Sequence, residues 1–250
     1  MRNTLGFVET PYEIAEFMVK LASVPRDAPV LDTGFGRGVF LRALLNQGYT
    51  RISGIEIQSD LYALGKKLYG SRSRLIQGDF LSWDFSESYQ LIVGNPPYIH
   101  YNQLPHPLKN IVAEISGTRE GDIYYAFIRR AINLLEAGGE LIYIVPYHFL
   151  YNTHAKHLRT YLLTQGAFRV IIDLGEVRLF RDVSPETVIF KWQKQGAPAP
   201  IEVLRLTQMR SLHPAQVAQA AWAALREHRS NALFEYYRIP PFSDSGPWSL

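Results

Sequence analysis

VLDTGFGRG, residues 30–38, joins a short apolar run to a turn that contains three alternating glycines. Val30 and Leu31 are typical of a buried strand, and Asp32 stands where that strand ends. Glycines let a backbone turn sharply and approach a ligand closely, and the helix expected after the turn presents its positive N-terminus there. A structural tight turn explains the pattern as well. The stretch therefore predicts a strand–turn–helix unit with a candidate ligand site.

The residues around this turn indicate the charge of the ligand. A dinucleotide fingerprint requires glycine or alanine at position 39, where this chain has Val39. The carboxylate of Asp32 would repel a pyrophosphate but favours a cationic ligand. S-adenosylmethionine, with its amino group and sulfonium, fits this preference, whereas NAD does not. The turn supplies the first part of the expected cofactor site, which comprises Asp32, Thr33, Gly34, Phe35, Gly36 and Gly38.

Outward from the turn, short apolar runs alternate with amphipathic helical stretches. The strands expected are 28–33, 51–57, 74–80, 89–95, 140–146, 168–175 and 187–192. The helices expected are 10–22, 39–48, 59–70 and 122–138. Thr10 and Glu13 predict a capping box at the start of the first helix. The alternation predicts an α/β fold with a doubly wound, mainly parallel sheet, in which ligands lie at the carboxyl ends of the strands.

Acids and an aromatic residue follow the next two strands. Glu56 stands where an acid accepts hydrogen bonds from both ribose hydroxyls of a nucleoside. Asp79 can accept a hydrogen bond from an adenine amino group, and Phe80 can pack on the base. A solvated glutamate and a simple turn are the alternatives. With Ile57 beside Glu56, these residues complete the cofactor site expected at the second and third strands.

LIVGNPPY, residues 91–98, ends the fourth strand in an amide, two prolines and an aromatic ring. An exocyclic amino nitrogen is a poor nucleophile because its lone pair is delocalised into the ring. Two acceptors, the side-chain oxygen of Asn95 and the carbonyl of Pro96, would hold its two hydrogens and localise that lone pair for in-line methyl transfer. Tyr98 offers a face on which a flat base or amide stacks. A rigid strand-ending turn is the alternative.

Taken together, these segments resemble the amino-group DNA methyltransferases of the adenine-N6 type, and especially the TaqI-like branch of the gamma group. The likeness covers about residues 5–193 and is carried by FVETPYEIAEFMVKLA, VLDTGFGRGVFL, GIEI, GDFL, LIVGNPPY, GDIYYAFIRRAINLLEAGGELIYIVP and LGEVRLFRDVSPETVIF. It implies a Rossmann-like, S-adenosylmethionine-dependent methyltransferase fold. It also implies an enzyme of a restriction-modification system that methylates N6 of an adenine flipped out of double-stranded DNA.

The resemblance also assigns residues. It implies that the cofactor site is lined by Thr10, Asp32, Gly34, Glu56, Asp79, Asn95 and Pro97. It implies that Asn95, Pro96 and Tyr98 hold the flipped adenine. Phe180 is the candidate for the aromatic residue that packs on the far face of that adenine, with a core phenylalanine as the alternative.

The expected domain division follows from a change in the sequence pattern after about residue 194, where the regular alternation of strands and helices ends. We expect residues 1–195 to form the catalytic domain. Residues 196–250 are expected to form a connector, an amphipathic helix and an aromatic tail, which lead to a target-recognition domain absent from this chain. A truncated enzyme, one half of a split enzyme and a natural minimal methyltransferase all stay open, and a separate target-recognition chain or a restriction partner is the expectation for a split enzyme. Methylation of RNA bases or of protein glutamine N5 stays open as the activity, and so does a cofactor-binding subunit without catalysis.

The composition of the chain limits the kinds of chemistry and the cellular location that can be expected. The chain has 250 residues and no cysteine, which excludes disulfides, thiolate catalysis and cysteine-ligated metal sites. We expect no metal. A formal net charge of +3 permits a polyanionic partner without requiring one. The start lacks a signal peptide, and the longest apolar run is too short to span a bilayer, so a cytoplasmic location without a membrane partner is expected.

Overall fold

The computed structural model of the chain describes residues 9–175, 177, 186–207 and 212–250. Its strands are β1 (Pro29–Asp32), β2 (Arg51–Glu56), β3 (Arg74–Gln77), β4 (Tyr89–Gly94), β5 (Leu135–Pro146), β6 (Gly166–Asp173), β7 (Thr187–Lys194), β8 (Ile201–Leu206) and β9 (Phe234–Ile239). Its α-helices are α1 (Tyr12–Lys20), α2 (Val39–Asn46), α3 (Ser59–Tyr69), α4 (His106–Ser116), α5 (Tyr124–Leu134), α6 (Lys156–Gln165) and α7 (Pro214–Glu227). Short 3-10 helices are η1 (Tyr101–Gln103), η2 (Tyr147–Leu150) and η3 (Thr153–Ala155).

The strands form one nine-stranded sheet in the order β3-β2-β1-β4-β5-β7-β6-β8-β9. The five strands from β3 to β5 pair in parallel, and β7 then runs antiparallel between β5 and β6. From β1, the chain first continues to β2 and β3 on one side and then to β4 and β5 on the other. The order thus reverses between β1 and β4, where the carboxyl ends of a doubly wound sheet open into a ligand crevice.

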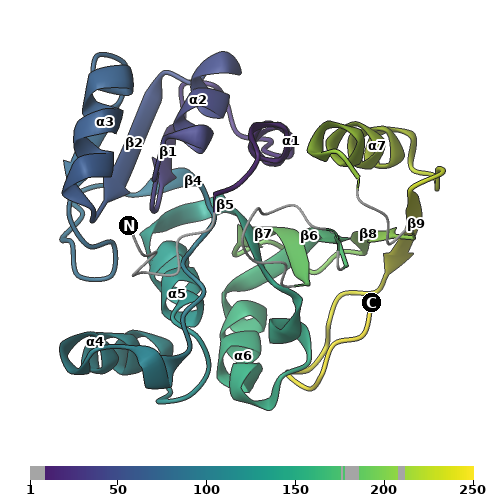
Figure 1. Cartoon of the computed structure of the whole chain (residues 1–250). Coiled ribbons are helices and arrows are strands. Elements are labelled where there is room, and N and C mark those ends of the chain that lie inside the picture. Colours follow the sequence, from purple (N-terminus) through teal and green to yellow (C-terminus); the bar gives the residue numbers. More distant parts are fainter. Residues whose placement is uncertain (1–8, 176, 178–185, 208–211) are drawn as a thin grey trace.

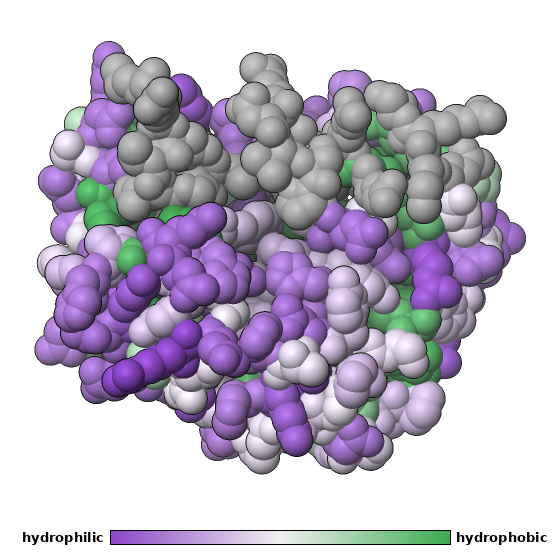
Figure 2. Space-filling view, turned by 60° about the horizontal axis from the view of Figure 1, so that its bottom comes forward, coloured by the Kyte–Doolittle hydropathy of each residue, from purple (hydrophilic) through white to green (hydrophobic). Residues whose placement is uncertain are grey.

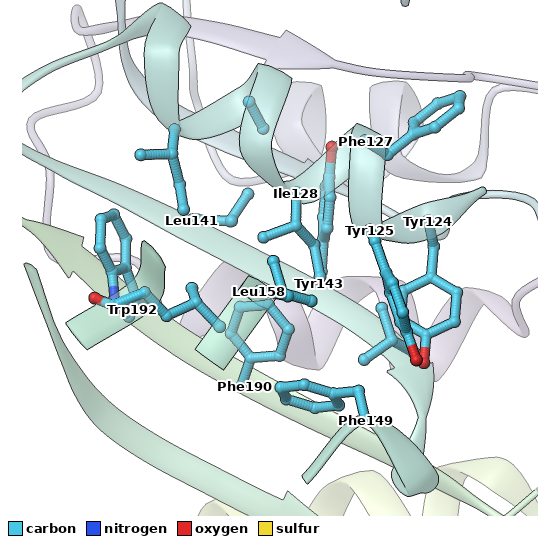
Figure 3. Packing of buried hydrophobic residues seen from close by; sticks show 14 of the residues in the cluster. Tyr124, Tyr125, Phe127, Ile128, Leu141, Tyr143, Phe149, Leu158, Phe190 and Trp192 are labelled. Atoms are coloured by element: carbon cyan, nitrogen blue, oxygen red, sulfur yellow. The ribbon is translucent and has the colours of Figure 1, made fainter. Parts of the chain in front are cut away.

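Helices cover both faces of the sheet, which gives three layers (Figure 1). Side chains alternate along each strand, so Val30 packs with the layer of α1, α2 and α7, while Leu31 packs with the layer of α4, α5 and α6. β4 repeats this pattern, with Leu91 on the first face and Ile92 on the second. Figure 3 shows the second core, where aromatic rings of α5, β5 and β7 meet. The glycine turn and the β4 end are therefore held by a rigid, buried sheet.

One local expectation is wrong, and two elements form where the sequence predicted neither a helix nor a strand. Pro11, and not Thr10, is the N-cap residue of α1, and no side chain caps that helix, so the capping box does not form. The polar stretch after residue 98 contains α4, which begins at His106 and buries Val112 against α5 and the sheet. The aromatic tail, expected to lack an element, contains β9, which pairs antiparallel with β8. In the last two cases burial against a distant partner outweighs a locally polar or proline-rich sequence.

Residues 201–239 share the sheet and the helical layer of the rest of the chain. β8 pairs with β6, and α7 packs on α1. The division at residue 195 stays a prediction. The lower side of Figure 1, where α4 and α6 lie, is mainly hydrophilic, with hydrophobic residues in separate areas (Figure 2). Of the helices in the described residues, none has the length and apolar character needed to cross a bilayer.

Candidate functional site

Four of the predicted site residues follow four neighbouring parallel strands at one edge of the sheet. Asp32 ends β1 and Glu56 ends β2, while Asp79 lies two residues after β3 and Asn95 follows β4 directly. Because the strand order is β3-β2-β1-β4, these side chains stand in the sequence Asp79, Glu56, Asp32 and Asn95 along the edge. Asp32 and Asn95 flank the point where the strand order reverses. The structure therefore brings the expected acids and the expected amide to one edge of the sheet.

Asp32 is the most buried acid of this edge, with 0% of its surface exposed. Burial raises the pKa of its carboxyl group to about 8, the Gly34 N–H opposes that rise, and the charge of Glu56 adds to it. Gly34 N donates to Oδ1 over 3.4 Å, whereas Oδ2 is buried and has no hydrogen-bond partner among the described residues. A buried carboxylate oxygen that lacks a donor fits a cationic amino group.

Glu56 ties the glycine turn to the next strand. Its Oε2 accepts from Gly36 N over 2.9 Å, and its Oε1 accepts from Gln58 N over 2.8 Å. Burial raises the pKa of Glu56, and these N–H donors oppose the rise. Each oxygen still has a second lone pair, so the carboxylate can both hold the turn and accept hydrogen bonds from a diol.

The turn itself needs glycine at two positions. Gly36 has φ 53° and Gly38 has φ 85°, both in the left-handed region that other residues rarely adopt. A Cβ at Gly38 would also lie 2.3 Å from the ring of Tyr69. A Cβ at Gly34, in contrast, would have nothing within 4 Å. The turn is thus packed on its helix side and open at Gly34. Phe35, predicted at the cofactor, places its ring in the core against Gly65.

The third strand ends in a local turn. Asp79 accepts from Leu81 N over 3.0 Å and from Ser82 Oγ over 3.1 Å. Phe80 is 3% exposed and packs on Phe127, with ring centroids 5.1 Å apart. Its buried ring does not offer an open face to a base. Trp83, which the sequence did not single out, lies against Gly78 and is 40% exposed. Ile57, 53% exposed beside Glu56, is a second apolar surface at this end.

Thr10 and Asn95, far apart in the chain, meet at the crevice. Asn95 Nδ2 donates to Thr10 Oγ1 over 3.1 Å, so the amide nitrogen faces Thr10 and the amide oxygen faces away from it. Thr10 is 3% exposed. A small pocket adjoins this contact, lined by Glu9, Thr10, Gly34, Phe35, Arg37, Val39, Phe40 and Asn95. The residue expected to cap α1 instead orients the side chain expected to hold the methyl acceptor.

Thr33 and Tyr143 form a further link that the sequence did not indicate. Thr33 Oγ1 and Tyr143 Oη lie 2.7 Å apart and are buried, joining the end of β1 to β5 across β4. A Cβ at Gly94 would lie 3.0 Å from Thr33 Oγ1, so glycine leaves room for the link. The predicted cofactor residue Thr33 thus stabilises the strand ends. Only the long-range pairing of the sheet brings Tyr143 to this place.

The remaining predicted residues of the fourth strand end lie beside Asn95. Pro96 is buried, and Pro97 and Tyr98 are partly exposed. Tyr98 Oη donates to the carbonyl of Ile144 over 3.0 Å, which fixes its ring beside β5. Burial raises the pKa of Tyr98, so its hydroxyl stays a neutral donor. Phe180 lies outside the described residues. In the described part of the chain, no group of three or more metal-binding side chains is present.

Comparison with solved structures confirms the fold class. A type I restriction-modification system methyltransferase subunit of Streptococcus thermophilus matches with a TM-score of 0.75 and 17% identity, over 94% of this chain and 56% of that one. A protein of Listeria monocytogenes, assigned as a class I S-adenosylmethionine-dependent methyltransferase, matches with a TM-score of 0.71 and 19% identity, over 90% of this chain and 72% of that one. At such identities the likeness concerns the fold.

Comparison with curated proteins concerns the sequence. The chain is 31% identical over 250 residues to the type II methyltransferase M.HincII of Haemophilus influenzae, which covers 98% of this chain and 46% of that protein. It is 33% identical over 203 residues to the type II methyltransferase M.TthHB8I of Thermus thermophilus, which covers 78% of this chain and 46% of that protein. The chain spans about half the length of these relatives.

The comparison with protein-family models agrees with the solved structures and with the curated relatives. The Eco57I restriction-modification methylase model matches residues 12–180. This stretch contains the glycine turn, the acids Asp32, Glu56 and Asp79, and LIVGNPPY. The expected cofactor, S-adenosylmethionine, agrees with this family and with the Listeria neighbour. The resemblance seen in the sequence is thereby confirmed at the level of a restriction-modification DNA methylase. The chain belongs to the Eco57I restriction-modification methylase family.

Proposed function

We propose that the chain binds S-adenosylmethionine at the edge formed by β3, β2, β1 and β4 and directs methyl transfer to N6 of an adenine flipped out of double-stranded DNA. The observation that carries this proposal is the meeting of Asp32 and Asn95 at the reversal of strand order, with Thr10 orienting the Asn95 amide. The type II methyltransferases among its relatives support DNA as the substrate class. The gamma-group order of motifs supports adenine N6.

The buried acid and the open turn support the cofactor assignment. The Asp32 oxygen that has no hydrogen-bond partner within the described part of the chain suits the amino group of S-adenosylmethionine, and Glu56 suits its ribose hydroxyls. Gly34 leaves room for close approach of a ligand to the backbone. Asp79 and the exposed face of Trp83 suit the adenine moiety. Thr33 and Phe35 have structural roles at this site. Thr33 joins the end of β1 to β5, and Phe35 fills the core beneath the turn.

Asn95, Pro96 and Tyr98 prepare the acceptor. The Asn95 amide oxygen and the Pro96 carbonyl accept the two N6 hydrogens, which localises the nitrogen lone pair. Tyr98 stacks on the base and keeps its plane fixed. S-adenosylmethionine, held by Asp32 and Glu56, would supply an electrophilic methyl group, whose C–S bond electrons would remain with the leaving sulfur as the nitrogen lone pair forms the new C–N bond. The positively charged nitrogen then loses one proton to water, so no general base is required.

Flipping of the base follows from the depth of the site. Asn95 lies at the end of a buried strand, and N6 of a stacked adenine cannot reach it inside a duplex. Because the chain spans about half the length of its relatives, we propose that sequence-specific DNA contacts come from residues outside this chain or from a partner chain. A restriction-modification system is the proposed context.

The experiment that tests the function offers labelled S-adenosylmethionine with unmethylated DNA, RNA and a protein extract in parallel. We expect label in DNA and, after hydrolysis of that DNA, N6-methyladenine as the labelled base. Label that appears in RNA or protein alone, or in cytosine, would refute the proposed substrate. No transfer to any of the three, with the cofactor bound, would instead favour a non-catalytic subunit.

The matched control separates binding from chemistry. Asn95→Ala removes an acceptor of the amino group, and we expect transfer to fall by at least about 100-fold while cofactor affinity changes by less than about 10-fold. Calorimetric titration with S-adenosylmethionine measures the second quantity. Equal losses of both would place Asn95 in the cofactor site alone.

A further inference from the structure

A series of side-chain contacts connects Tyr98 to η2, the segment that follows β5. Its ring meets the ring of Tyr124 edge to face, with centroids 6.2 Å apart. Tyr124 is 0% exposed, and its own ring packs on Tyr125 at 4.8 Å (Figure 3). On its other side, Tyr124 meets the imidazole of His148 at 6.1 Å between centroids. Besides its hydrogen bond to Ile144, the Tyr98 ring is therefore supported by a series of edge-to-face ring contacts whose outer member is His148.

His148 is held by Asp122. His148 Nε2 lies 2.9 Å from Asp122 Oδ2, and their side chains are 35% and 16% exposed. A carboxylate accepts hydrogen bonds and does not donate them, so the proton of the imidazole resides on Nε2. The Tyr124 hydroxyl, 3.4 Å from the same nitrogen, makes a longer contact. Asp122 thus sets both the protonated nitrogen and the orientation of the ring that packs on Tyr124.

The same acid belongs to the loop that holds the chain after Tyr98. Ile123 N donates to the Ile99 carbonyl over 2.9 Å, and Tyr101 N donates to the Gly121 carbonyl over 2.8 Å. These two bonds pair residues 99–101 with residues 121–123 as a short antiparallel bridge. The His148–Asp122 bond then fastens this bridge to η2, which follows β5. Backbone hydrogen bonds thus join residues 99–101 to residues 121–123, and the His148–Asp122 pair links both to η2.

We propose that His148 and Asp122 are positioning residues of the methyl-transfer site, which align Tyr98 before the acceptor base arrives. The proposal rests on the proposed function for its kinetic test, but the alignment itself is a property of the protein alone. Neither residue is among those proposed to contact the base, which are Asn95, Pro96 and Tyr98. Loss of His148 or Asp122 leaves the cofactor residues of β1 and β2 in place and allows the Tyr98 ring and the residue 99–101 segment to move.

A second pair, between neighbouring residues of the same region, provides a matched control. His154 Nδ1 lies 2.6 Å from Glu120 Oε2, between the loop before α5 and η3. Their side chains are 44% and 65% exposed, and neither packs on Tyr124 or Tyr98 in the contacts of the described residues. His154→Ala therefore removes a comparable hydrogen bond from the same region without disturbing the stack behind Tyr98.

The kinetic test uses single-turnover transfer from labelled S-adenosylmethionine to unmethylated DNA, with enzyme in excess. His148→Ala is expected to lower the transfer rate by about 10- to 100-fold, because small displacements of a positioned group cost that much. Cofactor affinity, measured by calorimetry, should change by less than about twofold. His148→Gln keeps an N–H that can reach Asp122 and should recover part of the rate. His154→Ala should stay within about twofold of the original chain.

A double variant shows whether His148 and Asp122 affect the transfer rate as one pair or independently of each other. Asp122→Ala should resemble His148→Ala, and the double variant should be no slower than either single variant. Losses that multiply in the double variant would overturn the pairing. A rate for His148→Ala within about twofold of the original chain would overturn the positioning role.

A spectroscopic test works without activity. In protein labelled with 3-fluorotyrosine, Tyr98→Phe assigns the fluorine resonance of Tyr98. We expect His148→Ala to shift or broaden this resonance and His154→Ala to leave it unchanged. An unchanged Tyr98 resonance in His148→Ala overturns the inference. If the original chain transfers no methyl group to DNA, the proposed function fails and the fluorine spectra alone decide the inference.

Discussion

At the scale of single residues, the site combines a buried acid with an oriented amide. Asp32 keeps a raised pKa of about 8 because burial disfavours its charged form. Asn95 is oriented by a hydrogen bond to Thr10. The first feature makes the site responsive to a cation, and the second determines which amide atom is presented to the acceptor base. Each feature leads to a separate measurement.

Cofactor binding should depend on pH through Asp32. A cation interacts with the ionised carboxylate, so below pH about 8 binding must release the proton that the ligand-free protein holds. We therefore expect the dissociation constant of S-adenosylmethionine to fall as pH rises from about 6 to 8, by up to about tenfold per unit, and then to level off. Calorimetry in buffers of different ionisation enthalpy measures the released proton. Asp32→Asn should bind weakly at every pH, and a steep pH dependence in this variant would contradict the assignment.

Thr10 should matter more for transfer than for stability. Thr10→Val keeps the shape but removes the acceptor of Asn95 Nδ2, so the amide loses its fixed direction. We expect the transfer rate to fall by about 10-fold, with a loss of unfolding free energy of about 1 kcal/mol. Thr10→Ser keeps the hydroxyl and should retain most of the rate. Equal rates for the valine and serine variants would show that this bond does not orient Asn95.

At the scale of elements, a buried ion pair fastens the connection between α1 and β1 to the sheet. Lys191 of β7 lies 2.8 Å from Glu140 of β5, and their side chains are 9% and 6% exposed. Lys191 Nζ also donates to the Leu21 carbonyl over 2.8 Å, and Glu140 accepts from Ser23 N over 2.8 Å. The end of the segment that brings Thr10 to the crevice is thereby held against β5 and β7.

Removing one charge of this ion pair should lower the free energy of unfolding more than removing both charges. Glu140→Ala leaves the buried ammonium of Lys191 without its counter-charge, which costs about 3–5 kcal/mol of unfolding free energy. Glu140→Leu combined with Lys191→Met removes both charges and should be more stable than Glu140→Ala. Urea denaturation of the single and double variants measures the coupling. A double variant less stable than Glu140→Ala would show that the charges themselves stabilise the fold.

At the scale of the whole molecule, the C-terminal tail returns to the α6 side of the sheet (Figure 1). The Trp248 ring stacks on Phe242 with centroids 4.3 Å apart, and the backbone N–H of Trp248 donates to the Leu150 carbonyl over 2.8 Å. Buried Arg159 donates to the carbonyls of Ser245 and Phe149 over 3.0 and 2.9 Å. The last residues of the chain thus support η2, the segment that carries His148.

Removing the anchor of this tail should loosen η2. Trp248 is 5% exposed, and Trp248→Ala should cost about 3–5 kcal/mol of unfolding free energy. Amide hydrogen exchange of residues 147–155 should become faster, while the glycine turn, which packs with the core on the opposite face of the sheet, keeps its protection. Trp222→Ala, at an exposed position of α7, is the control and should change stability by less than about 1 kcal/mol. Unchanged exchange in residues 147–155 would show that the tail does not support η2.

The isolated chain should bind its cofactor better than it modifies DNA. The chain spans about half the length of its curated relatives, so we expect weak transfer without strong sequence preference. Protection of plasmid DNA from restriction enzymes measures this outcome. Robust protection limited to one sequence would show that the chain itself contains the residues that read DNA.

Local sequence was enough for the strand–turn–helix unit at residues 30–38 and for the class of the fold. Alternation of apolar residues and left-handed glycines are properties of neighbouring positions, so they can be read along the chain. The acids and the asparagine at strand ends were recognisable for the same reason. Phe80 shows the limit, because a phenylalanine after a strand faces either the ligand or the core, and here it packs on Phe127.

Which residues meet was decided by the tertiary structure. The order β3-β2-β1-β4 brings the four strand ends into one row. Thr10 and Asn95 are 85 positions apart and Thr33 and Tyr143 are 110 apart, yet each pair shares a hydrogen bond. Such contacts form because two helical layers bury opposite faces of one sheet, and no local pattern records which distant partner that burial selects.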